Sequence, residues 1–379
     1  MGGLLFNYLR PLPIAAASLT NPAEQAEATN LSWPTQGSAA IGAQGYGVLA
    51  THGSQTPRPT ASMAKIITVL AVLEKHPLRL GEQGPTLTMT QADYNLYAKY
   101  MHEDGSYATV AVGEKISEYQ VLQATLLPSA NNMADSLAVW TFGSLDNYRA
   151  YANDMVKHFG LTSTTVGSDA SGFLPDSTST PSDFIKLGEL ALQNPVIAQI
   201  VAQPTATIPV QGVITSANSR LGINGIIGIK TGLTDQAGGC FLFAAKYTPS
   251  GSGPITIIGV IMGTANLNDA LKGSGPLLNS AKPYFSVKTP VKAGQVFATL
   301  TTAWTNSVQV IAKTNITLLA WRGAPLVPHI ELAQINRSLP ANTQVGTAII
   351  SSGESKATTP LVLRQAIQGP SWQWRVKRI

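Results

Sequence analysis

Apolar residues recur at helical spacing through the first half of the chain and form short unbroken runs after residue 220. The segment 62–75, SMAKIITVLAVLEK, is apolar on almost every side, so it predicts a buried helix that Pro77 ends. Further helices are expected over 116–127, 131–142, 146–161 and 180–194. In the last of these, Thr180 or Ser182 is the expected N-cap, because a hydroxyl there can accept an unpaired backbone N–H.

Strand-like segments lie on both sides of these helices. Residues 39–51 read as strand, turn and strand, and the runs GIIGIKTG, CFLFAAKYT and ITIIGVIMG are separated by glycine-rich turns. A last helix is expected over 267–284. We therefore expect the chain to leave and re-enter one sheet, with most helices inserted between its first and last strands.

From about residue 288 the pattern becomes alternating, with frequent turn residues, which predicts a small separate β domain. Residues 20–37 are rich in Asn, Ala, Gln, Thr and Pro and read as a linker. The chain of 379 residues, 44% of them hydrophobic, is long enough for one large and one small domain. The expected division is a leader or anchor stub with linker over 1–37, a main domain over 38–285, and a β-rich domain over 286–379.

The two ends carry weaker signals. Residues 4–19 are apolar but interrupted by Arg10, Pro11 and Pro13, with no basic region before them, so neither a signal peptide nor a membrane span is expected. A remnant of a membrane anchor and a disordered leader both remain open. The tail GPSWQWRVKRI mixes tryptophans with cations, which suits either a membrane interface or a last strand with a solvated end.

Composition narrows the function classes. Only 12% of the residues are charged, against about 25% in an average soluble protein, and a surface of this kind is common outside the cytoplasm. The net charge of +5 is scattered, without a basic stripe, so no nucleic-acid partner is expected. Cys240 is the single cysteine and the five histidines lack ligand spacing, so we expect no disulfide, no metal and no cofactor.

The first candidate for chemistry is the pair Ser62 and Lys65, at the start of the apolar helix. Residues three apart share a helix face, so the hydroxyl and the amine lie side by side. Burial lowers the pKa of a lysine, and a neutral amine could accept the serine proton. The plain alternative is an N-cap serine with a solvated lysine, since roughly one chance match to this motif is expected in a chain of this length.

The second candidate is Ser129-Ala130-Asn131, which follows a proline between two predicted helices. Its hydroxyl could relay a proton and its amide could hold a substrate amide, but a helix-capping turn explains the same residues. The triplet recurs at 216–218, so it has little specificity alone.

The third candidate is Lys230-Thr231-Gly232, at the end of an apolar run. The two side chains could bind a carboxylate, and the glycine would let a ligand backbone lie close to the strand. The alternative is an ordinary exposed strand end.

The three motifs together, S-x-x-K, S-x-N and K-T-G in this order, resemble the signature of penicillin-binding proteins and serine β-lactamases. The flanking segments RPTASMAKIIT, LLPSANNMADSLA, GIKTGLTDQAGGCFLFAA and DASGFLPDSTSTPSDFIKLG resemble low-molecular-mass penicillin-binding proteins, the serine-type D-alanyl-D-alanine carboxypeptidases. The resemblance covers about 38–285. It implies an α+β chain with the penicillin-binding/β-lactamase-like transpeptidase fold, an antiparallel sheet with helices and a helical subdomain, followed by a small all-β domain.

The resemblance also implies roles for the residues. Ser62 would be the acylated nucleophile and Lys65 its base. Ser129 would relay the proton to the leaving D-alanine, with Lys230 close to it.

Substrate binding would fall to neighbouring positions. Asn131 would bind the substrate backbone, Thr231 the terminal carboxylate, and Gly232 would keep the strand open to the ligand. The N–H groups of Ser62 and Leu233 would form the oxyanion hole. Some relatives hold the carboxylate with an arginine after the fourth strand. Here the stretch is GTANLNDALK, in which Lys272 is the candidate replacement.

The implied activity is removal of the terminal D-alanine from peptidoglycan stem pentapeptides through an acyl-enzyme, inhibited by β-lactams. A β-lactamase, a DD-transpeptidase or endopeptidase, and a catalytically silent wall-binding protein are the alternatives. Ala130 in place of the Asp common in class A β-lactamases, and the lack of a Glu-x-x-Leu-Asn segment, argue against a β-lactamase. The expected partners are the stem peptide and β-lactams, with a membrane surface as a further candidate, and the expected location is the cell envelope outside the cytoplasm, associated with the membrane.

Overall fold

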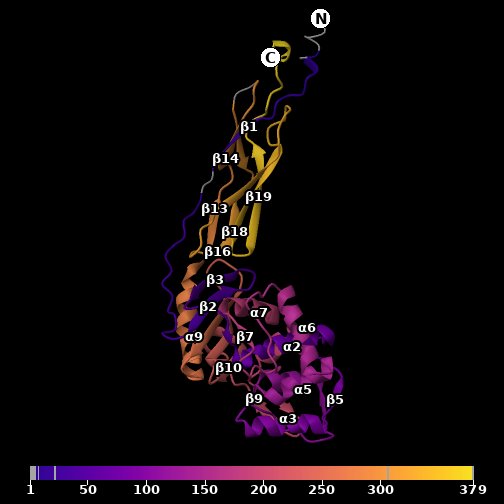
Figure 1. The fold of residues 1–379 in the computed structure, drawn as a ribbon. Helices are drawn as coiled ribbons and strands as arrows, with labels where there is room; N and C mark the ends of the chain where they lie inside the picture. The colour runs from indigo at the N-terminus through magenta and orange to yellow at the C-terminus, as the bar shows by residue number, and fades with distance from the viewer. Residues whose placement is uncertain (1–5, 7, 21–22, 305–306, 378–379) are drawn as a thin grey trace. The chain divides into compact units, whose positions relative to one another are not determined.

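A computed structural model describes residues 6, 8–20, 23–304 and 307–377 of the chain. Its contacts divide the chain into two compact units (Figure 1). The main unit comprises residues 30–249 and 253–283. The β unit comprises 250–252 and the described residues of 1–29 and 284–379.

A five-stranded antiparallel sheet forms the centre of the main unit, in the order β10-β11-β12-β2-β3. Its strands are β2 (Ser38–Ala43), β3 (Gly47–His52), β10 (Ile226–Thr234), β11 (Gly238–Tyr247) and β12 (Ile255–Thr264). The first two strands come from the start of the unit and the last three from its end. The expectation of one sheet entered from both ends of the helical region is therefore confirmed.

Helices cover both faces of this sheet. Alternate residues of a strand point to opposite faces, and on β12 Ile258 meets α7 (Pro181–Gln193) while Ile261 meets α9 (Leu267–Ala281). A glycine allows each close approach: a Cβ on Gly188 would lie 2.9 Å from Ile258, and one on Gly273 would lie 3.1 Å from Ile261. The sheet is thus buried between layers of helix, as its continuous apolar strands predict.

The helical region lies between β3 and β10 in sequence. Its remaining helical elements are η1 (Ala61–Ala64), α2 (Lys65–Lys75), α3 (Gln91–His102), α4 (Glu118–Leu126), α5 (Asn131–Phe142), α6 (Leu145–His158), α8 (Pro195–Val201) and η2 (Ile223–Gly225). Short strand pairs connect them: β4 (Arg58–Pro59) with β7 (Thr178–Ser179), β5 (Thr86–Thr88) with β6 (Lys115–Ser117), and β8 (Thr205–Ile208) with β9 (Gly212–Thr215).

The predicted helices are confirmed with ends shifted by a few residues. The segment predicted as one helix over 62–75 begins as a 3-10 turn and continues as α2. Thr180, one of the two candidate N-caps, accepts the N–H of Asp183 at 3.1 Å.

The β unit is built from a six-stranded sheet, in the order β1-β14-β15-β19-β18-β17, and the pair β13–β16. Its elements are β1 (Ala16–Leu19), β13 (Phe285–Val291), β14 (Val296–Thr301), β15 (Val308–Ala312), β16 (Ile316–Trp321), β17 (Pro328–Leu332), β18 (Gln344–Ser352), β19 (Ser355–Leu363) and α10 (Trp372–Lys377), with the 3-10 turn η3 (Lys282–Tyr284) preceding β13. Its apolar core includes Phe297, Val310 and Leu361. The α+β fold class with an all-β C-terminal region is confirmed.

The ends of the chain differ from expectation. The segment 1–37 was expected to be a leader and linker, but it contains the strand β1. This strand pairs with β14 and forms one edge of the six-stranded sheet. The tail forms the short helix α10 and not a last strand, and its Trp374 donates to the Ala303 carbonyl at 3.0 Å. Residues 4, 5, 7, 378 and 379 of the leader and tail lie outside the described residues. Within the ranges that the structure describes, no helix is both long enough and apolar enough to cross a membrane.

Candidate active site

Ser62 and Lys65 lie side by side where η1 passes into α2. The Lys65 Nζ is 2.8 Å from the Ser62 Oγ. Lys65 is completely buried, whereas Ser62 is half-buried and lines a cavity. The predicted helical spacing thus brings the hydroxyl and the amine into direct contact.

Lys65 is also held by two acceptors from other parts of the unit. Its Nζ donates to the Asn131 Oδ1 at 2.7 Å and to the Ser171 carbonyl at 2.9 Å. Burial lowers the pKa of Lys65 to about 7, although the negative charges of Asp169 and Asp135 act in the opposite direction. A large fraction of this amine is therefore neutral near pH 7 and able to accept a proton.

The second motif places a further hydroxyl beside a further lysine. Ser129, just before α5, has a left-handed φ of 68°, and its Oγ accepts from the Lys230 Nζ at 2.8 Å. Lys230 is 2% exposed and also donates to the Thr231 carbonyl at 3.1 Å. Burial, and after it the charge of Lys65, lower the pKa of Lys230 well below its ordinary value.

The third motif runs along the edge strand β10, which lies directly against η1. A Cβ on Gly232 would lie 3.0 Å from the Ala61 Cβ and 3.1 Å from the Ser62 nitrogen. A side chain at this position would therefore push the strand away from the serine. Glycine keeps the backbone of Gly232 and Leu233 beside the N–H of Ser62.

A cavity of about 250 Å³ opens between these motifs. Its lining consists of Ser62, Asp104, Gly105, Ser106, Pro128, Ser129, Asn131, Phe173, Ala217, Thr231, Gly232, Leu233, Thr234 and Leu267. The residues assigned roles by the three motifs are all in this lining except Lys65 and Lys230. Those two lie directly behind it, bonded to the two serines.

A buried acidic pair near Lys65 was not predicted. Asp135 on α5 accepts from the Tyr100 hydroxyl at 2.6 Å and from the Ala170 N–H at 2.9 Å. Asp169 accepts the N–H groups of Ser171 at 2.7 Å and, through its other oxygen, of Leu174 at 2.8 Å. Burial, as the main cause, raises the pKa of Asp135 to about 6. The sequence signal that could have found Asp135 is its position four residues after Asn131, on the same helix face.

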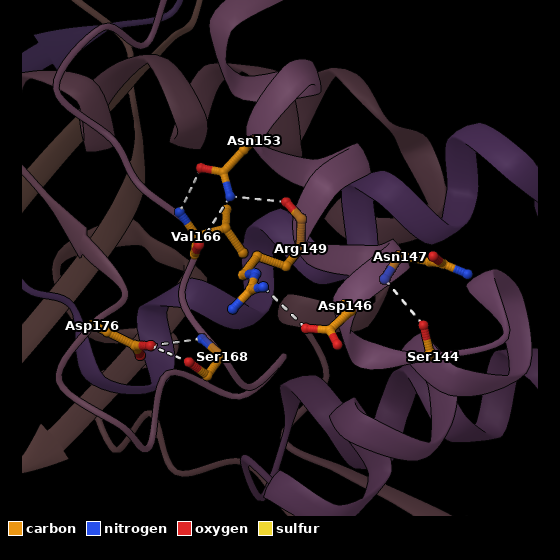
Figure 2. Close-up of polar contacts among 8 residues, drawn as sticks. All are labelled: Ser144, Asp146, Asn147, Arg149, Asn153, Val166, Ser168 and Asp176. Carbon is orange, nitrogen blue, oxygen red and sulfur yellow. Dashed lines mark hydrogen bonds and ion pairs between the residues drawn. The ribbon is translucent and has the colours of Figure 1, made fainter.

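Hydrogen bonds also hold the chain on both sides of Asp169 and Ser171, and Figure 2 shows them. Asn153 on α6 accepts the Val166 N–H at 3.0 Å and donates to the Val166 carbonyl at 2.9 Å. The Asp176 carboxylate accepts the Ser168 N–H at 2.8 Å. These bonds restrict the ends of the loop whose Ser171 carbonyl accepts from Lys65.

One expectation about the rim of the cavity is not supported. Lys272, the candidate replacement for the family's arginine, does not line the cavity and borders a separate hollow with Trp33 and Pro276. Leu267 lies at the rim instead, and the lining itself contains no lysine or arginine, since Lys65 and Lys230 lie behind it. Of the recurring triplet at 216–218, Ala217 contributes to the wall of the cavity.

Cys240 lies on β11 and is fully buried. Burial raises the pKa of its thiol to about 11, so it stays protonated near neutral pH. In the part of the chain that the structure describes, no group of His, Cys, Asp and Glu side chains could hold a metal ion.

The sequence of this chain is similar to those of known D-alanyl-D-alanine carboxypeptidases. The family model described as D-alanyl-D-alanine carboxypeptidase matches residues 27–266. A D-alanyl-D-alanine carboxypeptidase of Streptomyces sp. (strain K15) is 28% identical over 238 residues, which are 58% of this chain and 77% of that protein. The carboxypeptidase DacB2 of Mycobacterium tuberculosis is 30% identical over 204 residues, 52% of this chain and 66% of that protein.

Solved structures extend the likeness to the fold. Penicillin-binding protein 5 from Haemophilus influenzae matches with a TM-score of 0.63 at 19% identity, over 90% of this chain and 99% of that one. The Streptomyces K15 DD-transpeptidase matches with a TM-score of 0.56 at 23% identity, over 68% of this chain and 98% of that one. With a family model that covers more than half of its length, the chain belongs to the D-alanyl-D-alanine carboxypeptidase family.

Proposed function

We propose that Ser62 is the nucleophile with which this chain removes the terminal D-alanine from peptidoglycan stem pentapeptides. The family is one of serine carboxypeptidases that form acyl-enzymes and are inhibited by β-lactams, and its substrate lies outside the cytoplasm. The observation that carries the assignment to Ser62 is the contact of its Oγ with a fully buried lysine whose pKa is about 7.

In the acylation step, neutral Lys65 takes the Ser62 proton while the Oγ attacks the carbonyl of the penultimate D-alanine. The N–H groups of Ser62 and Leu233 stabilise the oxyanion that develops. When the C–N bond breaks, Ser129 passes a proton to the leaving amine and regains one from the lysines behind it. The products are the Ser62 ester and free D-alanine.

In the second step, water replaces the amine. A neutral lysine accepts a proton from the water as it attacks the ester carbonyl, and the Ser62 oxygen is reprotonated as it leaves. The shortened stem peptide dissociates with a new carboxylate.

Asn131 and β10 position the substrate in this proposal. The Asn131 amide bonds the peptide backbone, and Gly232 allows the peptide to lie along the strand. Thr231 holds the terminal carboxylate. With no arginine in the lining, the Thr231 hydroxyl, the neighbouring Thr234 hydroxyl and any residual charge on Lys230 supply the attraction.

Labelling with a fluorescent penicillin, followed by denaturing electrophoresis, tests the nucleophile. Wild-type protein should carry the label, Ser62→Ala should carry none, and the control Ser54→Ala, in the exposed loop before η1, should label like wild type. Release of D-alanine from a synthetic stem pentapeptide should follow the same order. An unlabelled wild type, or a labelled Ser62→Ala, would remove Ser62 from this role.

A DD-transpeptidase activity is the second candidate, because relatives from the same Streptomyces strain carry the names carboxypeptidase and DD-transpeptidase. Adding an amine acceptor to the pentapeptide assay separates the two outcomes. Transfer would give a peptide joined to the acceptor at the expense of the hydrolysed product. A β-lactamase would instead lose its penicillin adduct within seconds, whereas persistence for minutes would exclude it.

Membrane association is proposed from the aromatic and cationic tail of the β unit. Trp372 is 67% exposed, and α10 also carries Arg375 and Lys377. Cosedimentation with vesicles of anionic lipid should retain wild type and lose the double variant Trp372→Ala, Lys377→Ala. Equal recovery of both proteins in the supernatant would contradict this proposal.

A further inference from the structure

A second and larger hollow lies in the main unit, between β5, α3 and α5. Its volume is about 530 Å³, within the range of cavities that bind small molecules. Its walls are mainly apolar, with Leu87, Met89, Leu96, Val139 and Trp140. It shares no lining residue with the active-site cavity.

One polar group in this hollow has no partner. Ser136 on α5 is 3% exposed and lines the cavity, and its Oγ makes no hydrogen bond. A buried hydroxyl without a partner costs roughly 1–3 kcal/mol. Its neighbour Asp135 faces the network around Lys65 and is fully bonded there. The Ser136 oxygen itself is covered, so a molecule in the hollow reaches it once the Ser136 side chain rotates about its Cα–Cβ bond.

The lining of the hollow contains one negative and one positive side chain. Asp93 and Lys99 are both in its lining. The Asp93 carboxylate already accepts the Thr90 N–H at 2.7 Å and the Thr90 hydroxyl at 2.6 Å. The Lys99 ammonium lies 5.0 Å from the centre of the Tyr100 ring. One charge of each sign favours an occupant without a net charge.

We propose that this hollow is a second ligand site, which binds a small uncharged lipophilic molecule carrying one hydroxyl or carbonyl oxygen. The apolar body contacts Leu87, Met89 and Trp140, and the oxygen bonds the Ser136 hydroxyl. The inference is independent of the reaction at Ser62, because it rests on residues that take no part in that reaction.

Equilibrium dialysis with 2-naphthol and naphthalene as matched probes tests the site. Both have the same fused rings, but only 2-naphthol can bond Ser136. A hydrogen bond of ordinary strength corresponds to roughly a three- to tenfold change in affinity. Ser136→Ala should therefore weaken 2-naphthol binding by about that factor and leave naphthalene unchanged. Loss of the two probes to the same extent, or of neither, would overturn the assigned contact.

A cavity-filling variant provides the second measurement. Ala92 lies in the lining at an exposed position of α3, so Ala92→Trp should fill the space without disturbing the fold. Binding of both probes should be lost, while the control Ala150→Trp, at an exposed position of α6, should bind like wild type. Wild-type affinity in Ala92→Trp, or no binding by wild type, would overturn the site.

The penicillin adduct separates this hollow from the active site. Protein acylated with benzylpenicillin should bind 2-naphthol within twofold of the free protein. A larger loss would place the probe in the active-site cavity and contradict the proposal. Should penicillin fail to acylate the protein, the proposed function fails, while the dialysis with Ala92→Trp still decides the second site.

Discussion

The two units of the molecule differ in what they bury. The main unit buries charged side chains, namely Lys65, Glu114, Glu118, Asp135, Asp169, Glu189 and Lys230. Among the described residues of the β unit the buried polar side chains are only Thr302, Ser352 and Thr359, and none is charged. Burying a charge lowers stability unless the charge is paired or neutralised. The buried charges of the main unit therefore lower its stability, and we expect them to serve catalysis.

Among the buried charges of the main unit, two kinds differ in their bonding. Lys65, Lys230, Asp135 and Asp169 are hydrogen-bonded around the active-site cavity. Glu118, at the start of α4, has no partner for either carboxylate oxygen. Only the first kind is explained by the proposed reaction, so mutations should separate an effect on catalysis from an effect on stability.

The largest expected effect is on acylation. Lys65→Met removes the proposed base and fills its space with a side chain of similar length. General bases contribute roughly a hundred- to ten-thousandfold to rate, so penicillin labelling should slow by about a thousandfold or more. Lys75→Met, at an exposed position of the same helix, is the control and should label normally. Wild-type labelling in Lys65→Met would show that another group accepts the Ser62 proton.

The second effect is on stability and should depend on pH. Burial raises the pKa of Glu118 to about 7 from an ordinary value of 4.5. The folded state therefore binds the proton more tightly than the unfolded state, and this group makes the protein less stable as pH rises from 4.5 through 7. Glu118→Gln should exceed wild type in free energy of unfolding by roughly 1–3 kcal/mol at pH 8, and the gain should vanish near pH 4.

Urea unfolding at the two pH values measures this difference. Glu103→Gln, at an exposed position after α3, is the control and should change stability little at either pH. A Glu118→Gln protein that gains as much at pH 4 as at pH 8 would show that the stabilisation does not come from the charge.

The sequence predicts the elements and the motif order well, because helical spacing and apolar runs are local. Ser62 and Lys65 meet through a three-residue spacing on one helix, which a sequence reader can see. The role of Asp135 cannot be seen from local spacing in this way, because its contact with Ala170 joins α5 to a loop 35 residues later in the chain. The position of Lys272 outside the cavity lining has the same cause, since it depends on how α9 packs on the sheet.

The β1 strand was missed for a related reason. Residues 16–19 carry no alternation that distinguishes a strand from a leader, and all four are exposed. Their strand conformation comes from the backbone bonds to β14, almost three hundred residues later in the chain. An edge strand that is held only by backbone hydrogen bonds needs no particular pattern of side chains, so the sequence does not predict it.

A smaller effect is expected in the β unit. The fully buried Thr359 Oγ1 accepts the Thr314 N–H at 3.1 Å and donates to the Thr314 carbonyl at 3.0 Å. Thr359→Val keeps the shape and removes these two bonds and the 2.9 Å bond between the Thr359 and Thr314 hydroxyls, so the unfolding free energy of this unit should fall by about 1 kcal/mol. Penicillin labelling should not change. A loss of labelling would contradict the separation of roles between the two units.

The smallest effect should be a shift in a pH profile. The pKa of Asp135 is about 6 and that of Lys65 about 7, so Asp135 is charged over the range in which Lys65 loses its proton. Its negative charge raises the pKa of Lys65. Asp135→Asn should therefore lower that pKa and move the acid limb of the acylation rate to lower pH, by a fraction of a unit.

The rate of penicillin labelling between pH 5 and 9 measures the limb, and Asp154→Asn, on the exposed side of α6, should leave it in place. A merely structural role for Asp135 would lower the rate at every pH without moving the limb. A shift to higher pH would mean that Asp135 acts on Lys65 mainly by holding Tyr100 and the Ala170 loop, and not by its charge.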